Sequence, residues 1–382
     1  MKITITSLHL RHGGVEKVIA SLSNMLSDMG HEVEILCTYN LGEPVYPIHS
    51  SVKITYLTPY HPNRDEFHDA VARKNPFKII KEGIYGVIAL RAKDKTMRNA
   101  LKNIDTGMIV STRNEHSVML SEYGQENVYK VAQLHHDHLF DEKLINDFKN
   151  HYTNIDQFLL LTQGLADEVS EMMKETNSKT ICSWMPNFLD EDLIQNNLPK
   201  KKQVISAGRL HPDKGFDRLI DIWKIVWDAN PDYELIIAGE GDLEKSLKQQ
   251  VSNLNLSNSV HFVGTLNHPT LMTKMSESVA YAMTSITEGF ALVLVEGMSQ
   301  GTIPVAFDVR VGPRAIITDQ IDGFLVEDGD IQAFADKIQA LIDDEALRQK
   351  MEAAARIKSE TFSQKVIQKK WQNIIETAME EL

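Results

Sequence analysis

Short runs of apolar and β-branched residues alternate along the chain with longer stretches of helical periodicity. The first run, residues 2–7, alternates apolar and polar side chains, which is typical of a strand. The predicted strands cover residues 2–7, 33–37, 52–57, 107–112, 129–134, 157–162, 203–207, 233–238, 259–263, 279–284 and 302–307. Helical patterns separate most of these strands, for example over residues 14–29, 163–175, 215–229, 242–252 and 330–342.

Strands that alternate with helices predict parallel sheets connected by right-handed crossovers. The polar stretch 187–202, which contains Pro199, separates two sets of strands and is interpreted as a linker. The 382 residues are enough for two domains. We therefore predict an α/β fold of two doubly wound domains facing one another. The alternative is that 187–202 is a surface loop of one large domain.

Composition narrows the classes of function. The chain has 53 Asp and Glu against 40 Lys and Arg, a net charge of −13, which argues against a nucleic-acid binder. Two distant cysteines, Cys37 and Cys182, form neither a disulfide framework nor a metal motif and favour the cytoplasm. The N-terminus lacks the pattern of a secretory signal, and we expect no membrane-spanning helix.

Ligands of doubly wound sheets bind where strands end, so the residues after each strand are the first candidates for chemistry. Gly13 and Gly14 follow the first strand and precede a helix, where backbone N–H groups could meet an anion. Arg209 and Lys214 follow strand 203–207, and two cations there would suit a diphosphate. The alternatives are a tight turn for the glycines and a solvated surface for the charges.

Two carboxylates, Glu288 and Glu296, follow strand 279–284 at a spacing of eight. The apolar segment 290–295 between them fits either a buried strand or a helix ending at Gly301. If it is a helix, its first N–H groups are available to a phosphate, and the carboxylates could accept hydrogen bonds from sugar or ribose hydroxyls. A capping Glu and a surface Glu are the alternative. Together the three strand ends describe a nucleoside diphosphate bearing a sugar.

The stretch from Glu288 to Glu296 matches the EX7E motif of retaining glycosyltransferases of the GT-B fold, and the chain resembles glycosyltransferase family 4. The resemblance implies two Rossmann-like domains. Residues 1–190 would bind the acceptor, residues 200–360 would bind the nucleotide sugar, and a helix within 361–382 would return to the N-terminal domain. The resemblance to the family continues through residues 207–209, 214–216, 236–242, 261–264, 301–306 and 322–326.

The same resemblance implies roles for individual residues. Arg209 and Lys214 would hold the donor diphosphate and stabilise the leaving group, Glu296 would bind the ribose, and Glu288 would orient the donor sugar. A histidine after the fifth strand, His135 or His136, would contact the sugar as well. Further donor contacts would come from Gly13, Gly14, Val263 and the backbone of Gly289, Phe290, Ala291 and Leu292.

Sugar transfer passes through an oxocarbenium-like state while negative charge develops on the departing phosphate, so fixed cations favour the transition state. The resemblance requires no metal. The crowded histidines of 135–138 are interpreted as a poor metal site, since they cannot all point at one ion.

We therefore predict a retaining, metal-independent glycosyltransferase of the hexosyltransferase type, without a cofactor. It would move a sugar from a nucleotide-diphosphate sugar, UDP-linked by preference, to a hydroxyl. The acceptor would be a cell-envelope glycan, a polyol-phosphate or a lipid-linked molecule. The alternatives are a sugar-nucleotide epimerase or phosphorylase of the same fold and a non-catalytic sugar-nucleotide sensor.

Residues 64–102 depart from the acidic balance of the chain. They hold ten Lys and Arg against five Asp and Glu, interleaved with apolar residues. Such a segment is typical of contact with an anionic bilayer, which predicts a peripheral position on the inner face of the cytoplasmic membrane. The alternative is a core-facing helix with solvated lysines.

Overall fold

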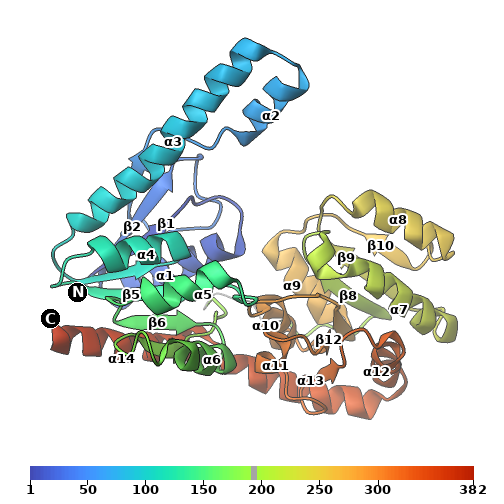
Figure 1. Ribbon diagram of the computed structural model, residues 1–382. Coiled ribbons are helices and arrows are strands. Elements are labelled where there is room, and N and C mark those ends of the chain that lie inside the picture. Colours follow the sequence, from blue (N-terminus) through green and yellow to red (C-terminus); the bar gives the residue numbers. More distant parts are fainter. Residues whose placement is uncertain (191–195) are drawn as a thin grey trace. The chain divides into compact units, whose positions relative to one another are not determined.

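Two compact units make up the chain (Figure 1). In the computed structural model, which describes residues 1–190 and 196–382, the N-terminal unit comprises Met1–Met185 together with Gln368–Leu382. The C-terminal unit comprises Pro186–Ile367. The predicted linker 187–202 falls in this second unit, and its residues 191–195 lie outside the described residues.

The N-terminal unit is built on a seven-stranded parallel sheet in the order β3-β2-β1-β4-β5-β6-β7. Its central strands are buried almost throughout, because helices cover both faces of a parallel sheet. The chain reverses its direction of growth between β1 and β4, which is where a doubly wound sheet offers a ligand site. The strands are β1 (Lys2–Ser7), β2 (Glu32–Tyr39), β3 (Lys53–Thr58), β4 (Met108–Ser111), β5 (Tyr129–Leu134), β6 (Gln157–Leu160) and β7 (Ile181–Trp184).

The helices of this unit include a long hairpin. The longest helix begins with Pro76 at its first position and Asn75 as its N-cap, whose side chain accepts from the backbone N–H of Lys78. With the short helix before it, this helix projects beyond the sheet in Figure 1. No helix within residues 1–190 and 196–382 is long and apolar enough to cross a membrane. The helices are α1 (Gly14–Asp28), α2 (Arg64–Ala72), α3 (Pro76–Lys102), α4 (Asn114–Tyr123), α5 (Glu142–Asn150) and α6 (Gln163–Met173).

The last helix, α14 (Gln364–Glu381), belongs mostly to the N-terminal unit. Trp371, Ile375 and Ala378 are buried on it, and the Lys370 ammonium lies 4.0 Å from the ring centre of Trp184. The predicted return of the C-terminal helix is therefore confirmed.

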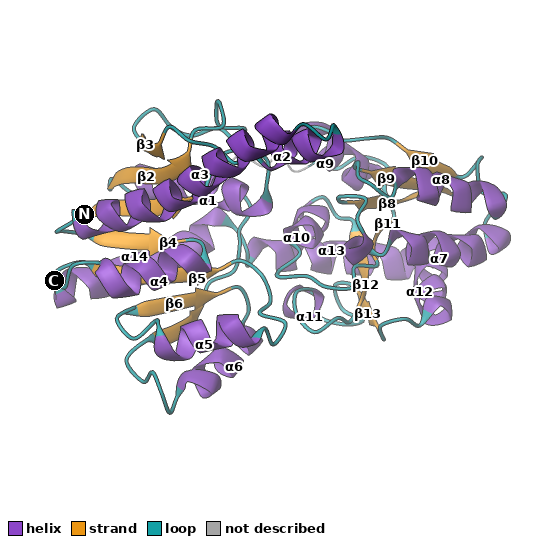
Figure 2. Ribbon diagram, turned by 45° about the horizontal axis from the view of Figure 1, so that its top comes forward, coloured by secondary structure: helices purple, strands orange, loops and turns teal. Residues whose placement is uncertain are grey.

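The C-terminal unit repeats the same strand order in a six-stranded parallel sheet, β10-β9-β8-β11-β12-β13. Helices lie on both sides of the strands in Figure 2. The strands are β8 (Gln203–Ala207), β9 (Glu234–Ala238), β10 (Val260–Phe262), β11 (Ala280–Met283), β12 (Ile303–Phe307) and β13 (Phe324–Val326). The helices are η1 (Pro212–Lys214, a 3-10 turn), α7 (Phe216–Ala229), α8 (Glu244–Asn253), α9 (His268–Glu277), α10 (Leu292–Ser299), α11 (Pro313–Ile316), α12 (Ile331–Asp343) and α13 (Glu345–Glu360).

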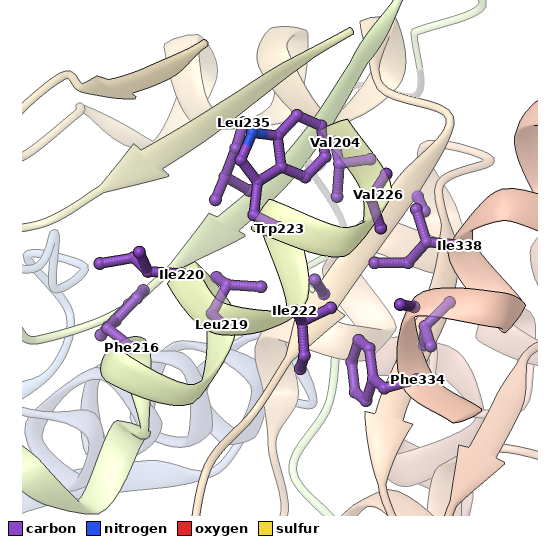
Figure 3. Close-up of a cluster of buried hydrophobic side chains, with 14 of the residues drawn as sticks. Val204, Phe216, Leu219, Ile220, Ile222, Trp223, Val226, Leu235, Phe334 and Ile338 are labelled. Carbon is purple, nitrogen blue, oxygen red and sulfur yellow. The ribbon is translucent and has the colours of Figure 1, made fainter. Parts of the chain in front are cut away.

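The core of the C-terminal unit is centred on Trp223 of α7, whose side chain is fully buried (Figure 3). Its indole N–H donates to Ser259 Oγ at 3.2 Å, so the polar edge of the ring is satisfied inside the core. α12 packs Phe334 and Ile338 beside α7, while Val204 and Leu235 come from the sheet. This packing fixes the strand ends from which the candidate site is built.

The predicted fold class, two doubly wound α/β domains, is confirmed. Every predicted strand and helix is present to within two residues at either end. The sequence analysis missed β7 and β13, which are short. The open choice over residues 290–295 is resolved in favour of a helix, because Ala291 takes a left-handed conformation (φ 69°) that ends the preceding extended chain and α10 starts at Leu292.

Replacing Trp223 with Ala tests the position of this core. Removing a buried aromatic ring from a packed interior destabilises by about 3–5 kcal/mol. We expect the urea midpoint of the C-terminal unit, followed by far-UV circular dichroism, to fall strongly. The matched control is Trp227→Ala, because Trp227 on the same helix is only partly buried. Equal losses in the two variants would contradict the assignment of Trp223 to the core.

Candidate functional site

The carboxyl ends of β8 and β11 carry an ion pair. Lys214 closes the 3-10 turn η1 after β8, and Glu288 lies in the loop after β11. The Lys214 Nζ is 2.7 Å from Glu288 Oε1, and both side chains are largely buried. A charge-assisted contact of this length is strong because partial burial weakens the screening by water. The two residues predicted at separate strand ends are therefore brought together.

Backbone contact between the two loops produces this pairing. Gly215 has φ +59°, and a Cβ atom there would lie 2.1 Å from the carbonyl oxygen of Thr284. The Thr284 hydroxyl donates to the Gly215 carbonyl at 2.9 Å, and the Ile286 N–H donates to the Asp213 carbonyl at 2.8 Å. Only glycine fits a left-handed conformation against another backbone at this distance. Any larger residue at 215 would separate Lys214 from Glu288.

Ser285 is a site residue that the sequence analysis did not single out. Its hydroxyl donates to Glu288 Oε1 at 2.7 Å, so one carboxylate oxygen accepts from both Ser285 and Lys214. The available signal was its position directly between the strand end and Glu288.

The second carboxylate of the motif lies on α10. Glu296 is buried, and its Oε1 is 3.1 Å from His268 Nε2 at the start of α9. The N–H of Leu294 donates to the Ala291 carbonyl at 2.9 Å, which leaves the N–H groups of Leu292 and Val293 to suit an anion. Phe290 is a core side chain that packs edge-on against Phe362 at 5.5 Å, so only its backbone is available to a ligand. No sequence signal pointed to His268.

Two other predicted donor residues lie near strand ends without joining the ion pair. Arg209 follows β8 with an exposed side chain, and its guanidinium has no ion-pair partner among residues 1–190 and 196–382. Val263 follows β10 and is partly exposed. The N–H of Gly239 donates to the carbonyl of Gly264 at 2.8 Å, which links the ends of β9 and β10 beside it.

The far end of α10 is held by two cations. Arg356 donates to the carbonyls of Ser299 and Gln300 at 2.9 and 2.8 Å, and the Lys200 Nζ donates to that of Gly301 at 2.7 Å. Burial lowers the pKa of Lys200 to about 8. Cations at a helix C-terminus satisfy its last carbonyls and oppose its dipole. They fix the helix that carries Glu296.

In the N-terminal unit, Gly13 and Gly14 follow β1 as predicted. A Cβ atom at Gly13 would overlap the carboxylate of Glu16, whereas the space beside Gly14 is open. Glu16 is buried and accepts from Arg113 Nη2 at 3.2 Å. A side chain at position 13 would collide with the Glu16 carboxylate, so a contact within the N-terminal unit accounts for the glycine there.

His135 lies directly after β5, and both its ring nitrogens are buried without a hydrogen-bond partner. Burial first, then His136 and Arg113, lowers its pKa to about 4, so the ring is neutral at physiological pH. His136 donates from Nδ1 to the Asp137 carbonyl at 2.8 Å, and buried His138 lies 3.4 Å from Glu168. No group of three His, Cys, Asp or Glu within the described part of the chain could hold a metal ion. The absence of a metal from the reaction stays a prediction.

These features define a protein with the GT-B fold, and comparison with known proteins supports its class. Residues 190–358 match the family model described as "Glycosyl transferases group 1". The fold, this match and the relatives below together support a glycosyltransferase of the GT-B fold. Membership of family 4 and the EX7E assignment stay predictions.

The chain is similar over nearly its whole length to several curated glycosyltransferases. It is 26% identical to an uncharacterized glycosyltransferase of Haemophilus influenzae, covering 95% of this chain and 96% of the relative. It is also 26% identical to the amylovoran biosynthesis glycosyltransferase AmsD of Erwinia amylovora, at 95% and 96% coverage. A Campylobacter jejuni N-acetylgalactosaminyltransferase named for an undecaprenol diphosphate-linked acceptor is 24% identical over 98% of both chains.

Solved structures share the fold. TarM of S. aureus, in a complex with UDP, superposes with a TM-score of 0.75 at 16% identity, covering 98% of this chain and 100% of that one. HepE of Anabaena, in complex with UDP, gives 0.74 at 18% identity, covering 99% and 100%.

The buried imidazoles of the N-terminal unit predict sensitivity to acid. His135 and His116 have folded pKa values of about 4 against an ordinary value of 6.5. Below pH 6.5 the unfolded chain therefore binds more protons, and stability falls as pH drops toward 4. We expect His135→Gln to reduce the loss of urea midpoint between about pH 7.5 and about pH 5. A loss equal to that of the natural protein would contradict the depressed pKa of His135.

Proposed function

We propose that the protein is a retaining glycosyltransferase of family 4 that transfers a sugar from UDP to an acceptor hydroxyl. The observation that carries the proposal is the contact between Lys214 and Glu288 at the carboxyl ends of β8 and β11. A cation for the leaving diphosphate and a carboxylate for the donor sugar stand side by side there. They lie in the same unit as α10, whose first N–H groups suit a phosphate.

The ion pair explains how donor binding would prepare the site. A diphosphate carries more negative charge than Glu288 and would take over the Lys214 ammonium. Glu288 would then keep the hydrogen bond from Ser285 and gain capacity to accept from hydroxyls of the donor sugar. As the glycosidic bond breaks, Lys214 and the exposed Arg209 would offset the charge on the departing phosphate. In this proposal the two cations would take the place of a metal ion.

Glu296 would bind the ribose. An ionised carboxylate is an acceptor only, and vicinal hydroxyls offer two donors to it. Its contact with His268 at 3.1 Å fixes the carboxylate on α10. The nucleobase would lie beside Val263 of the same unit. UDP is favoured because TarM and HepE were solved with it.

Names of the relatives support an acceptor from the cell envelope. AmsD acts in amylovoran biosynthesis, and the Campylobacter relative is named for a lipid-linked acceptor. A cell-envelope glycan, a polyol-phosphate or a lipid-linked molecule are the acceptor classes we propose. An epimerase would need no acceptor, and a sensor would show no turnover, so both alternatives are separable by assay.

The hairpin of α2 and α3 supports a place at an anionic membrane. Phe77, Ile80 and Ile84 are 86%, 62% and 58% exposed, and Val87 and Ile88 continue the same face at helical spacing. We name these five residues the α3 stripe. An exposed apolar surface of this kind marks an interaction site. The predicted alternative, a core-facing helix, describes the side of α3 that buries Ala89, Met97 and Leu101, whereas the α3 stripe is exposed.

Charge decides which partner suits the α3 stripe. Lys81, Arg91 and Lys95 are exposed on the same face, whereas the two acids of α3, Glu82 and Asp94, are partly buried. A symmetric contact between two copies would place these cations against each other. An anionic bilayer would attract the cations and take up the apolar side chains. We therefore propose a peripheral position on the inner face of the cytoplasmic membrane.

Substitutions in the ion pair test the transferase function. With UDP-sugars and an oligosaccharide acceptor panel, we expect Lys214→Ala and Glu288→Gln each to lower kcat by about 10²–10³, the usual cost of removing one charge-stabilising contact. Glu296→Ala should weaken UDP affinity roughly tenfold or more, because a hydrogen bond to a charged group is worth about 1.5–3 kcal/mol.

The product and a control variant complete this test. NMR of the new linkage should show the anomeric configuration of the donor. Lys224→Ala is the matched control, because Lys224 pairs with Asp228 on the surface of α7, away from the strand ends. Full turnover by Glu288→Gln, or inversion of configuration, would refute the proposal.

Vesicle binding tests the α3 stripe. Ile84→Glu with Ile88→Glu should reduce sedimentation with phosphatidylglycerol vesicles more than tenfold, since each buried aliphatic side chain contributes about 1.5–3 kcal/mol. Ile357→Glu, on exposed Ile357 of α13, is the control and should bind as the natural protein does. Equal binding to neutral and anionic vesicles, or concentration-dependent dimers lost in the double variant, would overturn the membrane position.

A further inference from the structure

A guanidinium lies against the contact between the loops that follow β8 and β11. Arg218 stands in the first turn of α7, just after Gly215. Its Nη2 donates to the carbonyl oxygen of Thr284 at 2.5 Å, and its Nε would lie 3.0 Å from a Cβ atom at position 215. The carbonyl that Gly215 approaches so closely is therefore the one that Arg218 holds.

Two further contacts fix the Arg218 side chain. Its Nη1 donates to Asp328 Oδ1 at 2.7 Å, in the loop between β13 and α12. Its guanidinium carbon lies 4.5 Å from the ring centre of Phe307, a buried residue of β12. A planar guanidinium can stack on an aromatic ring while its N–H groups donate in fixed directions, which an ammonium cannot do. One side chain thus joins α7 to the end of β11, to β12 and to the loop after β13.

The helix that carries Arg218 does not account for a cation at this position. The N-terminus of a helix has a partial positive charge, so a cation in the first turn is unfavourable. The Nε of Arg218 is also buried without a hydrogen-bond partner among residues 1–190 and 196–382, which costs free energy. Both penalties are offset by contacts outside α7, those with Thr284, Asp328 and Phe307. These outside contacts therefore account for the place of the guanidinium.

Thr284 connects Arg218 to the ion pair. The Thr284 hydroxyl donates to the Gly215 carbonyl at 2.9 Å, while its own carbonyl accepts from Arg218. Glu288 lies further along the loop that Thr284 begins, and Lys214 directly precedes Gly215. Lys214 Nζ and Glu288 Oε1 are 2.7 Å apart. A displacement of Thr284 would therefore change the distance between the two charges.

We propose that Arg218 is a positioning residue of the donor site, which sets the separation of Lys214 and Glu288 by holding the Thr284 carbonyl against Gly215. Both terminal nitrogens of Arg218 already donate within the C-terminal unit. Arg218 therefore acts through the two loops and not on the donor itself. The inference rests on the proposed transferase function and adds to it a residue that lies outside the stretch from Glu288 to Glu296.

Hydrogen exchange followed by mass spectrometry tests the positioning without turnover. The Ile286 N–H donates to the Asp213 carbonyl from one loop to the other, so its exchange reports on their contact. We expect Arg218→Ala to speed exchange in peptides covering residues 284–288 by about tenfold. Arg218→Lys keeps the charge but loses the planar fork, and it should speed exchange in the same direction. Exchange as slow as in the natural protein, in either variant, would overturn the proposal.

The matched control for exchange is Arg348→Ala. Arg348 also donates to a backbone carbonyl, that of Leu341 at 2.7 Å, but at the C-terminal end of α12. We expect this variant to leave both the exchange of residues 284–288 and the turnover unchanged. Equal acceleration in Arg348→Ala and Arg218→Ala would indicate a general loss of stability and would contradict a positioning role.

Kinetic coupling tests whether the positioning reaches the ion pair. With a UDP-sugar as substrate, we expect Arg218→Ala to lower kcat about tenfold in the natural protein but less than about threefold in a Glu288→Gln background. Residues that act through a shared contact are not additive, whereas a merely structural role would give equal losses. Equal losses in the two backgrounds would overturn the proposal. No turnover by the natural protein would refute the proposed function alone, and the exchange measurement would still decide whether Arg218 holds the two loops.

Discussion

The chemistry of the C-terminal unit depends on how closely two loop backbones approach each other. β8 and β11 are neighbours in the sheet, so the loops that follow them leave the same edge side by side. Gly215 lets one loop touch the Thr284 carbonyl of the other, and their mutual hydrogen bonds hold them there. The ion pair of Lys214 and Glu288, and the hydrogen bond from Ser285, follow from that contact. The sheet order thus determines which charges meet.

The two units offer different electrostatic surroundings. The C-terminal site contains a partly buried cation and carboxylates, which suits a step in which charge develops on a phosphate. The N-terminal unit instead holds a neutral imidazole, His135, at the end of β5, and its Arg113 is paired with buried Glu16. The net charge of −13 for the whole chain describes neither of these surroundings, because Lys214 and Arg113 are each paired with a nearby carboxylate.

Periodicity located α1, α6, α7, α8 and α12, because each of these helices buries a regular apolar face. It did not single out α3 or α13. The strand pattern missed β7 and β13. Because ligands bind at strand ends, Lys214 and Glu288 could be predicted as site residues. Their contact with each other could not be predicted. Ser285 had a signal in its place between the end of β11 and Glu288, whereas His268 could not be found in this way, since it contacts Glu296 from another segment. The exposure of the α3 stripe could not be predicted from the sequence either, because a helical pattern does not show which apolar face is covered by other elements.

The path of α14 has a consequence for the order in which the chain folds during synthesis. Residues 368–382 complete the N-terminal unit, and Trp371 and Ile375 are buried there. Chains are made from the N-terminus, and contiguous domains can fold as they emerge. The C-terminal unit is contiguous and has all its residues first. The unit that begins the chain must hold its sheet with an uncovered apolar surface until the final helix leaves the ribosome.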